Sequence, residues 1–97
     1  MNYDWVAAFE WDAHKSHLCF EQRGFDFAYA SRAFDDPHRV QKEDVRWDYG
    51  ERRFQIMGRI DGRLYVVIFA DRISKRRIIS ARKANLREVW VYENHPR

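Results

Sequence analysis

Residues 54–69 read FQIMGRIDGRLYVVIF, and this stretch decides the fold because it contains the clearest hairpin of the chain. Asp61-Gly62 is typical of a two-residue turn between antiparallel strands. The nearly continuous apolar run Leu64 to Phe69 predicts a central strand that is covered on both faces. The preceding run, Phe54 to Met57, predicts the strand that pairs with it.

Further turns and strands flank this hairpin. Towards the C-terminus, Ile73-Ser74-Lys75 predicts a turn and Arg77 to Ser80 predicts a strand. Towards the N-terminus, Asp48-Tyr49-Gly50 predicts a turn, and the stretch Val40 to Trp47 has a period of two. These segments together favour a small, mostly antiparallel sheet.

The N-terminal third predicts one strand and two helices. A strand over Val6 to Trp11 leads to Asp12, which is a good N-cap for a helix that ends before Gly24. A second helix, Phe27 to Phe34, is capped by Asp26.

A third helix is predicted over Ala81 to Glu93, where Leu86, Val89 and Trp90 recur at helical spacing. We therefore expect one α+β domain over residues 1–97, with two N-terminal helices and one C-terminal helix on one side of the sheet. The aromatic residues expected in its core are Trp11, Phe27, Phe34, Trp47, Phe54, Phe69 and Trp90.

Composition narrows the class of protein. The chain has 97 residues, of which 45% are hydrophobic and 34% charged, which is typical of a folded domain. Apolar runs such as Tyr65 to Ala70 fall far short of the roughly 18 residues that a membrane-spanning helix needs. Met1 to Phe9 show no secretory signal, and the lone Cys19 cannot form an internal disulfide, so we expect a cytoplasmic protein.

Charge is divided unevenly along the chain. Met1 to Pro37 carries three Lys or Arg against seven Asp or Glu, a net charge of −4, so the remainder carries +7. Between Arg72 and Arg87 there are seven basic residues and no acidic one. Most cations are Arg, whose planar guanidinium matches phosphate geometry. The pattern favours a polyanionic ligand, with an ordinary solvated basic face as the alternative.

Several short motifs follow one another in an order that resembles the BrnT-type toxins, over roughly Phe9 to Tyr92. These motifs are Phe9-Glu10-Trp11-Asp12 followed by Lys15, Phe34-Asp35-Asp36-Pro37, Gly50-Glu51-Arg52-Arg53, Gly62-Arg63-Leu64, Val66-Val67 and Arg77-Ile78-Ile79-Ser80-Ala81-Arg82-Lys83-Ala84. The resemblance implies a RelE-like fold and a ribonuclease toxin of a bacterial type II toxin–antitoxin module. It also implies RNA as substrate, catalysis without a metal or cofactor, and no membrane partner.

The same resemblance implies a partner and a point of departure. The partner would be a small DNA-binding antitoxin in a complex of two toxins and two antitoxins, in which the toxin touches DNA little or not at all. In the family the first helix usually carries an Asn after its Lys and closes with Lys-His-Gly, whereas Cys19 and Gln22-Arg23-Gly24 stand here. The alternative reading is therefore a weakened or inactive relative that still binds RNA or the antitoxin.

Cleavage of RNA without a metal requires neutralisation of the phosphate oxygens and proton transfer at the 2′ and 5′ oxygens. Arg72, Arg77 and Arg82 are the candidates for the first task. At a spacing of five, Arg77 would face opposite to the other two in extended structure, unless a turn after Arg72 brings them back together. The alternative is structural: Arg77 pairs with strand neighbours, and Arg82 caps the last helix through an ion pair.

Three residues are candidates for proton transfer, each with a structural alternative. Glu51 is a possible general base, or a salt-bridged turn residue. His14 has an imidazole that titrates near neutrality, and Lys15 matches the helical Lys of the family. His14, His17 and Cys19 do not form a metal site, because Cys19 is rotated away from the helix face of the two His.

Other residues are expected to bind the substrate or the antitoxin. The basic candidates for RNA binding are Arg53, Arg63, Lys75, Arg76 and Lys83. Tyr49 and Tyr65 are candidates for stacking on an unpaired base. An acidic antitoxin segment would cover the Arg cluster and bury Val91 and Tyr92.

Overall fold

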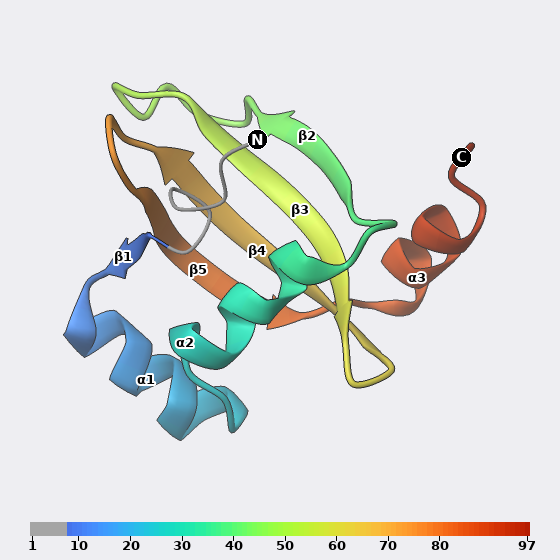
Figure 1. Ribbon diagram of the computed structural model, residues 1–97, viewed down its shortest axis with the longest axis horizontal. Helices are drawn as coiled ribbons and strands as arrows, with labels where there is room; N and C mark the ends of the chain where they lie inside the picture. The colour runs from blue at the N-terminus through green and yellow to red at the C-terminus, as the bar shows by residue number, and fades with distance from the viewer. Residues whose placement is uncertain (1–7) are drawn as a thin grey trace.

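A computed structural model describes residues 8–97 as a five-stranded sheet with helices packed on it (Figure 1). The strands are β1 (Phe9–Trp11), β2 (Val40–Asp44), β3 (Arg53–Ile60), β4 (Arg63–Asp71) and β5 (Arg76–Lys83), in the order β1-β5-β4-β3-β2. β1 pairs with β5 in parallel, and the other neighbours pair antiparallel. The predicted α+β class with a mostly antiparallel sheet is confirmed. Val6 and Ala7 of the predicted first strand lie outside the described residues.

The predicted hairpin joins β3 to β4. Asp61 and Gly62 have φ angles of 49° and 84°, as the tight turn between right-twisted strands requires. β4 lies in the middle of the sheet, so the prediction of a central strand is confirmed. The turn before β5 is also confirmed, since the N–H of Arg72 donates to the carbonyl oxygen of Lys75.

The N-terminal helices begin at the predicted caps. α1 (Ala13–Arg23) starts where the Asp12 carboxylate accepts from the N–H of Lys15, and it ends at Gly24 with a φ angle of 86°. α2 (Phe27–Ala30) begins after Asp26 and tightens into the 3-10 helix η2 (Ser31–Asp35). The predicted single helix over Phe27 to Phe34 is therefore two short helical segments.

The predicted start of the last helix is wrong. Ala81 and Lys83 continue β5, because they pair with Val67 and Tyr65 of β4. The helix α3 (Leu86–Glu93) begins after Asn85, where a capping box forms: the side chains of Asn85 and Glu88 each accept from the backbone N–H of the other residue.

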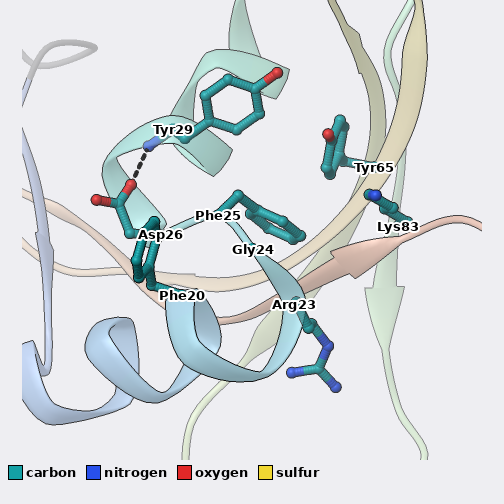
Figure 2. Close-up of a pocket in the computed structure, with 8 residues that line it drawn as sticks. All are labelled: Phe20, Arg23, Gly24, Phe25, Asp26, Tyr29, Tyr65 and Lys83. Atoms are coloured by element: carbon teal, nitrogen blue, oxygen red, sulfur yellow. Dashed lines mark hydrogen bonds between the residues drawn. The ribbon is translucent and has the colours of Figure 1, made fainter.

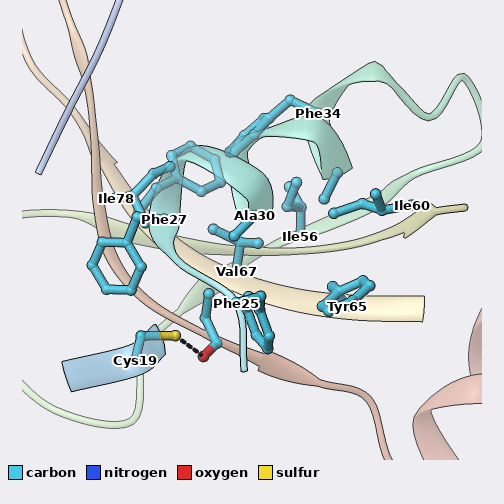
Figure 3. Close-up of a cluster of buried hydrophobic side chains, with 13 residues drawn as sticks. Cys19, Phe25, Phe27, Ala30, Phe34, Ile56, Ile60, Tyr65, Val67 and Ile78 are labelled. Carbon is cyan, nitrogen blue, oxygen red and sulfur yellow. Dashed lines mark hydrogen bonds between the residues drawn. The ribbon is translucent and has the colours of Figure 1, made fainter. Parts of the chain in front are cut away.

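Helices pack on both faces of the sheet, so the expectation that they share one side is wrong. On the first, called the covered face, side chains of α1, α2 and η2 enclose the main core, which includes Phe34, Val67 and Phe69 (Figure 3). On the opposite face, Val89 and Tyr92 of α3 contact a smaller cluster at one end of the sheet. Its strand residues are Met57, Leu64 and Val66. Figure 1 shows α1 and α2 together and α3 apart from them.

Two aromatic residues expected in the core are exposed. Trp47 lies in the β2–β3 connection with 73% of its surface exposed, and Trp90 lies on the outer side of α3 with 65% exposed. The other five expected aromatic residues are buried in the main core or packed against it. In the part of the chain that the structure describes, no helix is long and apolar enough to cross a membrane.

A buried carboxylate joins distant parts of the chain. Asp36, directly after η2, accepts hydrogen bonds from the Tyr92 hydroxyl of α3 and from the backbone N–H groups of Arg59 and His38. Burial alone would raise the pKa of Asp36, but these hydrogen bonds outweigh it and lower the pKa. Burial and the Asp36 charge raise the pKa of Tyr92 to about 12.

Candidate functional site

α3 leaves part of the second sheet face uncovered, and this part is called the open face. Its strand residues are Arg53, Gln55, Ile68, Arg77, Ser80 and Arg82, which share a face by strand alternation and are at most half-buried.

A β-bulge aligns the arginines of β5. Ile68 of β4 pairs with Ser80, but the next residue, Phe69, pairs with Ile78, so Ile79 is an extra residue in β5. The bulge shifts the alternation by one residue. Arg77 and Arg82, five residues apart, therefore both point to the open face, opposite to the orientation that a regular strand would give.

At one end of the open face a carboxylate joins two arginines. Glu51 lies 3.5 Å from Nε of Arg53 and 3.2 Å from Nη2 of Arg72. The Arg53 guanidinium lies over the ring of Tyr49, 4.2 Å from its centroid. The Tyr49 hydroxyl donates to Asp44 at 3.1 Å, and this bond helps the Arg46 guanidinium to lower the pKa of Asp44. Glu51 is therefore the ion-pair partner of a turn, as the structural alternative predicts.

The two arginines of β5 also have acidic partners. Arg77 lies 3.6 Å from Glu10, its neighbour in β1, and both side chains are about 30% exposed. Arg82 donates two hydrogen bonds of 2.8 Å to Glu88 in the first turn of α3. These bonds raise the pKa of Arg82 and lower the pKa of Glu88. Both ion pairs match the structural alternative, and both leave the arginines accessible to solvent.

The remaining predicted site residues lie elsewhere. His14 and Lys15 are exposed on α1, and Lys83 and Tyr65 point to the covered face. Arg76 also lies on that face, with its guanidinium over the rings of Phe34 and Phe69.

Two further predicted cations stand at the ends of the sheet: Arg63 beside the β3–β4 turn and Lys75 in the β4–β5 turn. The structure thus brings together Arg53, Arg72, Arg77, Arg82, Glu51 and Tyr49 and separates them from the rest.

Sequence reasoning missed the two carboxylates that hold the β5 arginines, Glu10 and Glu88. Glu10 lies 67 positions before Arg77, and only the parallel pairing of β1 with β5 brings them together. Glu88 carried a local signal, because Asn85 followed by Glu88 is the pattern of a capping box.

The open face suits an anionic ligand better than a metal. Within residues 8–97, no group of three or more His, Cys, Asp or Glu side chains is placed to hold a metal ion. Four guanidinium groups present planar donors that match phosphate oxygens, and the ion pairs that orient them are exposed and therefore weak.

Comparison with known proteins identifies the family. Among curated proteins, no match to this chain is found. Residues 11–88 match the family described as the ribonuclease toxin BrnT of type II toxin–antitoxin systems. The matched segment spans β1 to the first turn of α3 and includes the whole open face except for Glu10. Because the match covers most of the chain, the protein belongs to the BrnT family of ribonuclease toxins of type II toxin–antitoxin systems.

Proposed function

We propose that this chain is a metal-independent endoribonuclease toxin that binds and cleaves RNA on the open face of its sheet. One observation carries the proposal: the bulge at Ile79 places Arg77 and Arg82 on the same uncovered face as Arg53 and Arg72. A regular strand would have split them between the two faces. Four cations on one exposed face form a surface to which a phosphate backbone can bind.

The arginines would stabilise the charge that develops on the phosphate during cleavage. Exposed ion pairs contribute only about 0–1 kcal/mol, so an RNA phosphate can replace Glu10 beside Arg77 at small cost. Arg82 is held more firmly, because its two hydrogen bonds to Glu88 are short and Glu88 is largely buried. We therefore assign Arg77 to direct phosphate contact, and we assign Arg82 to a contact with the neighbouring phosphate from a fixed position.

Proton transfer is the less developed part of the site. Glu51 and Tyr49 are the titratable groups beside Arg53, and Glu51 is the proposed base for the 2′-hydroxyl. Asp44 and Glu88 are poor acids, because hydrogen bonds from Arg46 and Arg82 lower their pKa values. The expected products are a 2′,3′-cyclic phosphate and a 5′-hydroxyl.

The alternative reading concerns the end of α1, where Gln22 and Arg23 replace the Lys-His of the family. These residues lie with Cys19 and Phe27 beside a small pocket between α1 and β5, away from the open face. If proton transfer belongs there, the chain binds RNA or its antitoxin without cleaving. A gain of cleavage in Gln22→Lys with Arg23→His, with none in the parent, would support this alternative.

We further propose that a DNA-binding antitoxin neutralises the chain in a 2:2 complex. The predicted burial of Tyr92 at this interface is wrong, since Tyr92 is already buried inside the protein and donates to Asp36. Leu86, Trp90 and Val91 are the exposed apolar residues of α3 that remain for docking, next to Arg82. A RelE-like fold and a cytoplasmic location stay predictions.

The test is expression without the antitoxin, followed by cleavage assays with purified protein. Wild-type protein should arrest growth and cleave RNA in the presence of a chelator. Arg77→Ala and Arg82→Ala should each lower the cleavage rate at least about tenfold while the protein stays folded, and Arg52→Ala serves as the control because Arg52 pairs with Glu43 on the covered side. Unchanged cleavage in both folded variants would place the site elsewhere.

A further inference from the structure

A pocket of about 390 Å³ opens on the covered-face side of the molecule, where α1 ends (Figure 2). Three rings form its inner wall: Phe25 lies 5.0 Å from Tyr65 and 6.2 Å from Tyr29, and the two Tyr rings are 5.8 Å apart, measured between centroids. Phe20 stands at the pocket with 55% of its surface exposed. The size and the aromatic lining are those of a site for a small planar group.

Two cations at this pocket lack acidic partners. Arg23 and Lys83 both line it, and in the described part of the chain neither has a carboxylate within ion-pair distance. The arginines of the open face, in contrast, are all paired with Glu side chains. Asp26, the carboxylate among the lining residues, is already held by the N–H of Tyr29. The pocket therefore offers aromatic surface together with unneutralised positive charge.

We propose that this pocket binds one unstacked nucleobase of the RNA, with Arg23 and Lys83 contacting the adjacent phosphates. The proposal rests on the proposed function, because it supplies a subsite for the same substrate. An aromatic surface beside cations is how proteins hold single-stranded RNA without strong sequence preference. A purely apolar peptide segment would leave both cations unused.

The strand order provides a path between the two sites. β1 pairs with β5 only as far as Ile78, so the rest of β5 has no strand partner on that side. Arg82 and Lys83 are consecutive in β5 and point to opposite faces. A single strand of RNA that passes around this end of the sheet would contact Arg82 on the open face and then Lys83 at the pocket.

The test measures binding without cleavage. The probe is a fluorescein-labelled 2′-O-methyl oligoribonucleotide, which has no free 2′-hydroxyl, and the readout is fluorescence anisotropy. Phe20→Ala should weaken binding about 5- to 150-fold, the usual range for one stacked base, and Phe20→Tyr should restore it. Leu18→Ala is the matched control, since Leu18 is a partly exposed apolar residue of the same helix outside this pocket.

The cations are tested by salt dependence. Arg23→Gln with Lys83→Gln should weaken binding and reduce the slope of log affinity against log salt by about two, one for each lost phosphate contact. Thermal unfolding of each variant shows whether the protein stays folded.

The outcomes separate this proposal from the proposed function. If the protein does not cleave but Phe20→Ala weakens binding, the subsite stands. If cleavage depends on Arg77 while RNA affinity is the same with and without Phe20, the subsite is wrong. Unchanged RNA affinity with loss of antitoxin co-purification in Phe20→Ala would overturn the proposal and show protein docking instead.

Discussion

The two faces of β4 place neighbouring residues in different surroundings. Phe69 is fully buried on the covered face, where it contacts Phe34 and Phe54 with ring centroids 5.0 and 5.7 Å away. Ile68, the residue before it, lies half-buried on the open face. On the covered face the side chains are determined by packing, whereas on the open face they are free to serve a ligand. The predictions below test this division.

The largest effect is expected on the covered face. Phe69→Ala should lower the free energy of unfolding by about 3–5 kcal/mol, because it removes a ring from a closely packed cluster. Ile68→Ala, its neighbour on the other face, should cost less than about 2 kcal/mol because the site is partly open to water. Denaturant unfolding measures both. Equal losses would mean that the open face is as tightly packed as the covered one.

A smaller effect is expected where the two faces are joined, at Asp36. Asp36→Asn should cost about 1–3 kcal/mol, because it weakens three hydrogen bonds to a buried group. The pKa of Asp36 is lowered in the folded protein, so its contribution is present above the unfolded value of about 3.8 and is lost as pH falls below it.

Unfolding at a series of pH values checks this. Wild-type stability should decline more steeply than that of Asp36→Asn below about pH 4. Tyr92→Phe, which keeps the ring and removes the hydroxyl, is the companion variant. Parallel pH curves for wild type and Asp36→Asn would contradict the assignment.

The smallest effect on stability is expected on the open face itself. The coupling energy between Arg77 and Glu10, measured by a double-mutant cycle with Arg77→Gln and Glu10→Gln, should be about 0–1 kcal/mol, because the pair is partly exposed. The contrast is with cleavage, which should respond strongly to Arg77. A coupling above about 2 kcal/mol would indicate that the pair serves mainly to hold β1 against β5.

Local signals predicted much of the fold. Asp61-Gly62, the Asp12 cap and the apolar run of β4 each act over a few residues, and each structure formed as predicted. The end of β5 was not predictable in this way, because Ala81 to Lys83 are suited to a helix and are held in the strand by pairing with β4.

The candidate site was predictable only in its residue types. The Arg-rich run indicated an anionic ligand, but the faces of Arg77 and Arg82 depend on the bulge at Ile79, which has no marker in the sequence. Glu10 escaped notice because its contact with Arg77 spans most of the chain. Trp47 and Trp90 were expected in the core, because aromatic spacing alone does not distinguish an inner helix face from an outer one.

The parallel pairing of β1 with β5 also bears on when the protein becomes active during its synthesis. Glu10 is translated 67 residues before Arg77, a delay of roughly 3 to 13 s at ordinary elongation rates. Until then the β5 arginines do not exist, and Tyr92, which contacts Asp36, is made later still. A ribosome therefore releases this toxin almost complete before the toxin can fold, which leaves time for a waiting antitoxin to meet the finished chain.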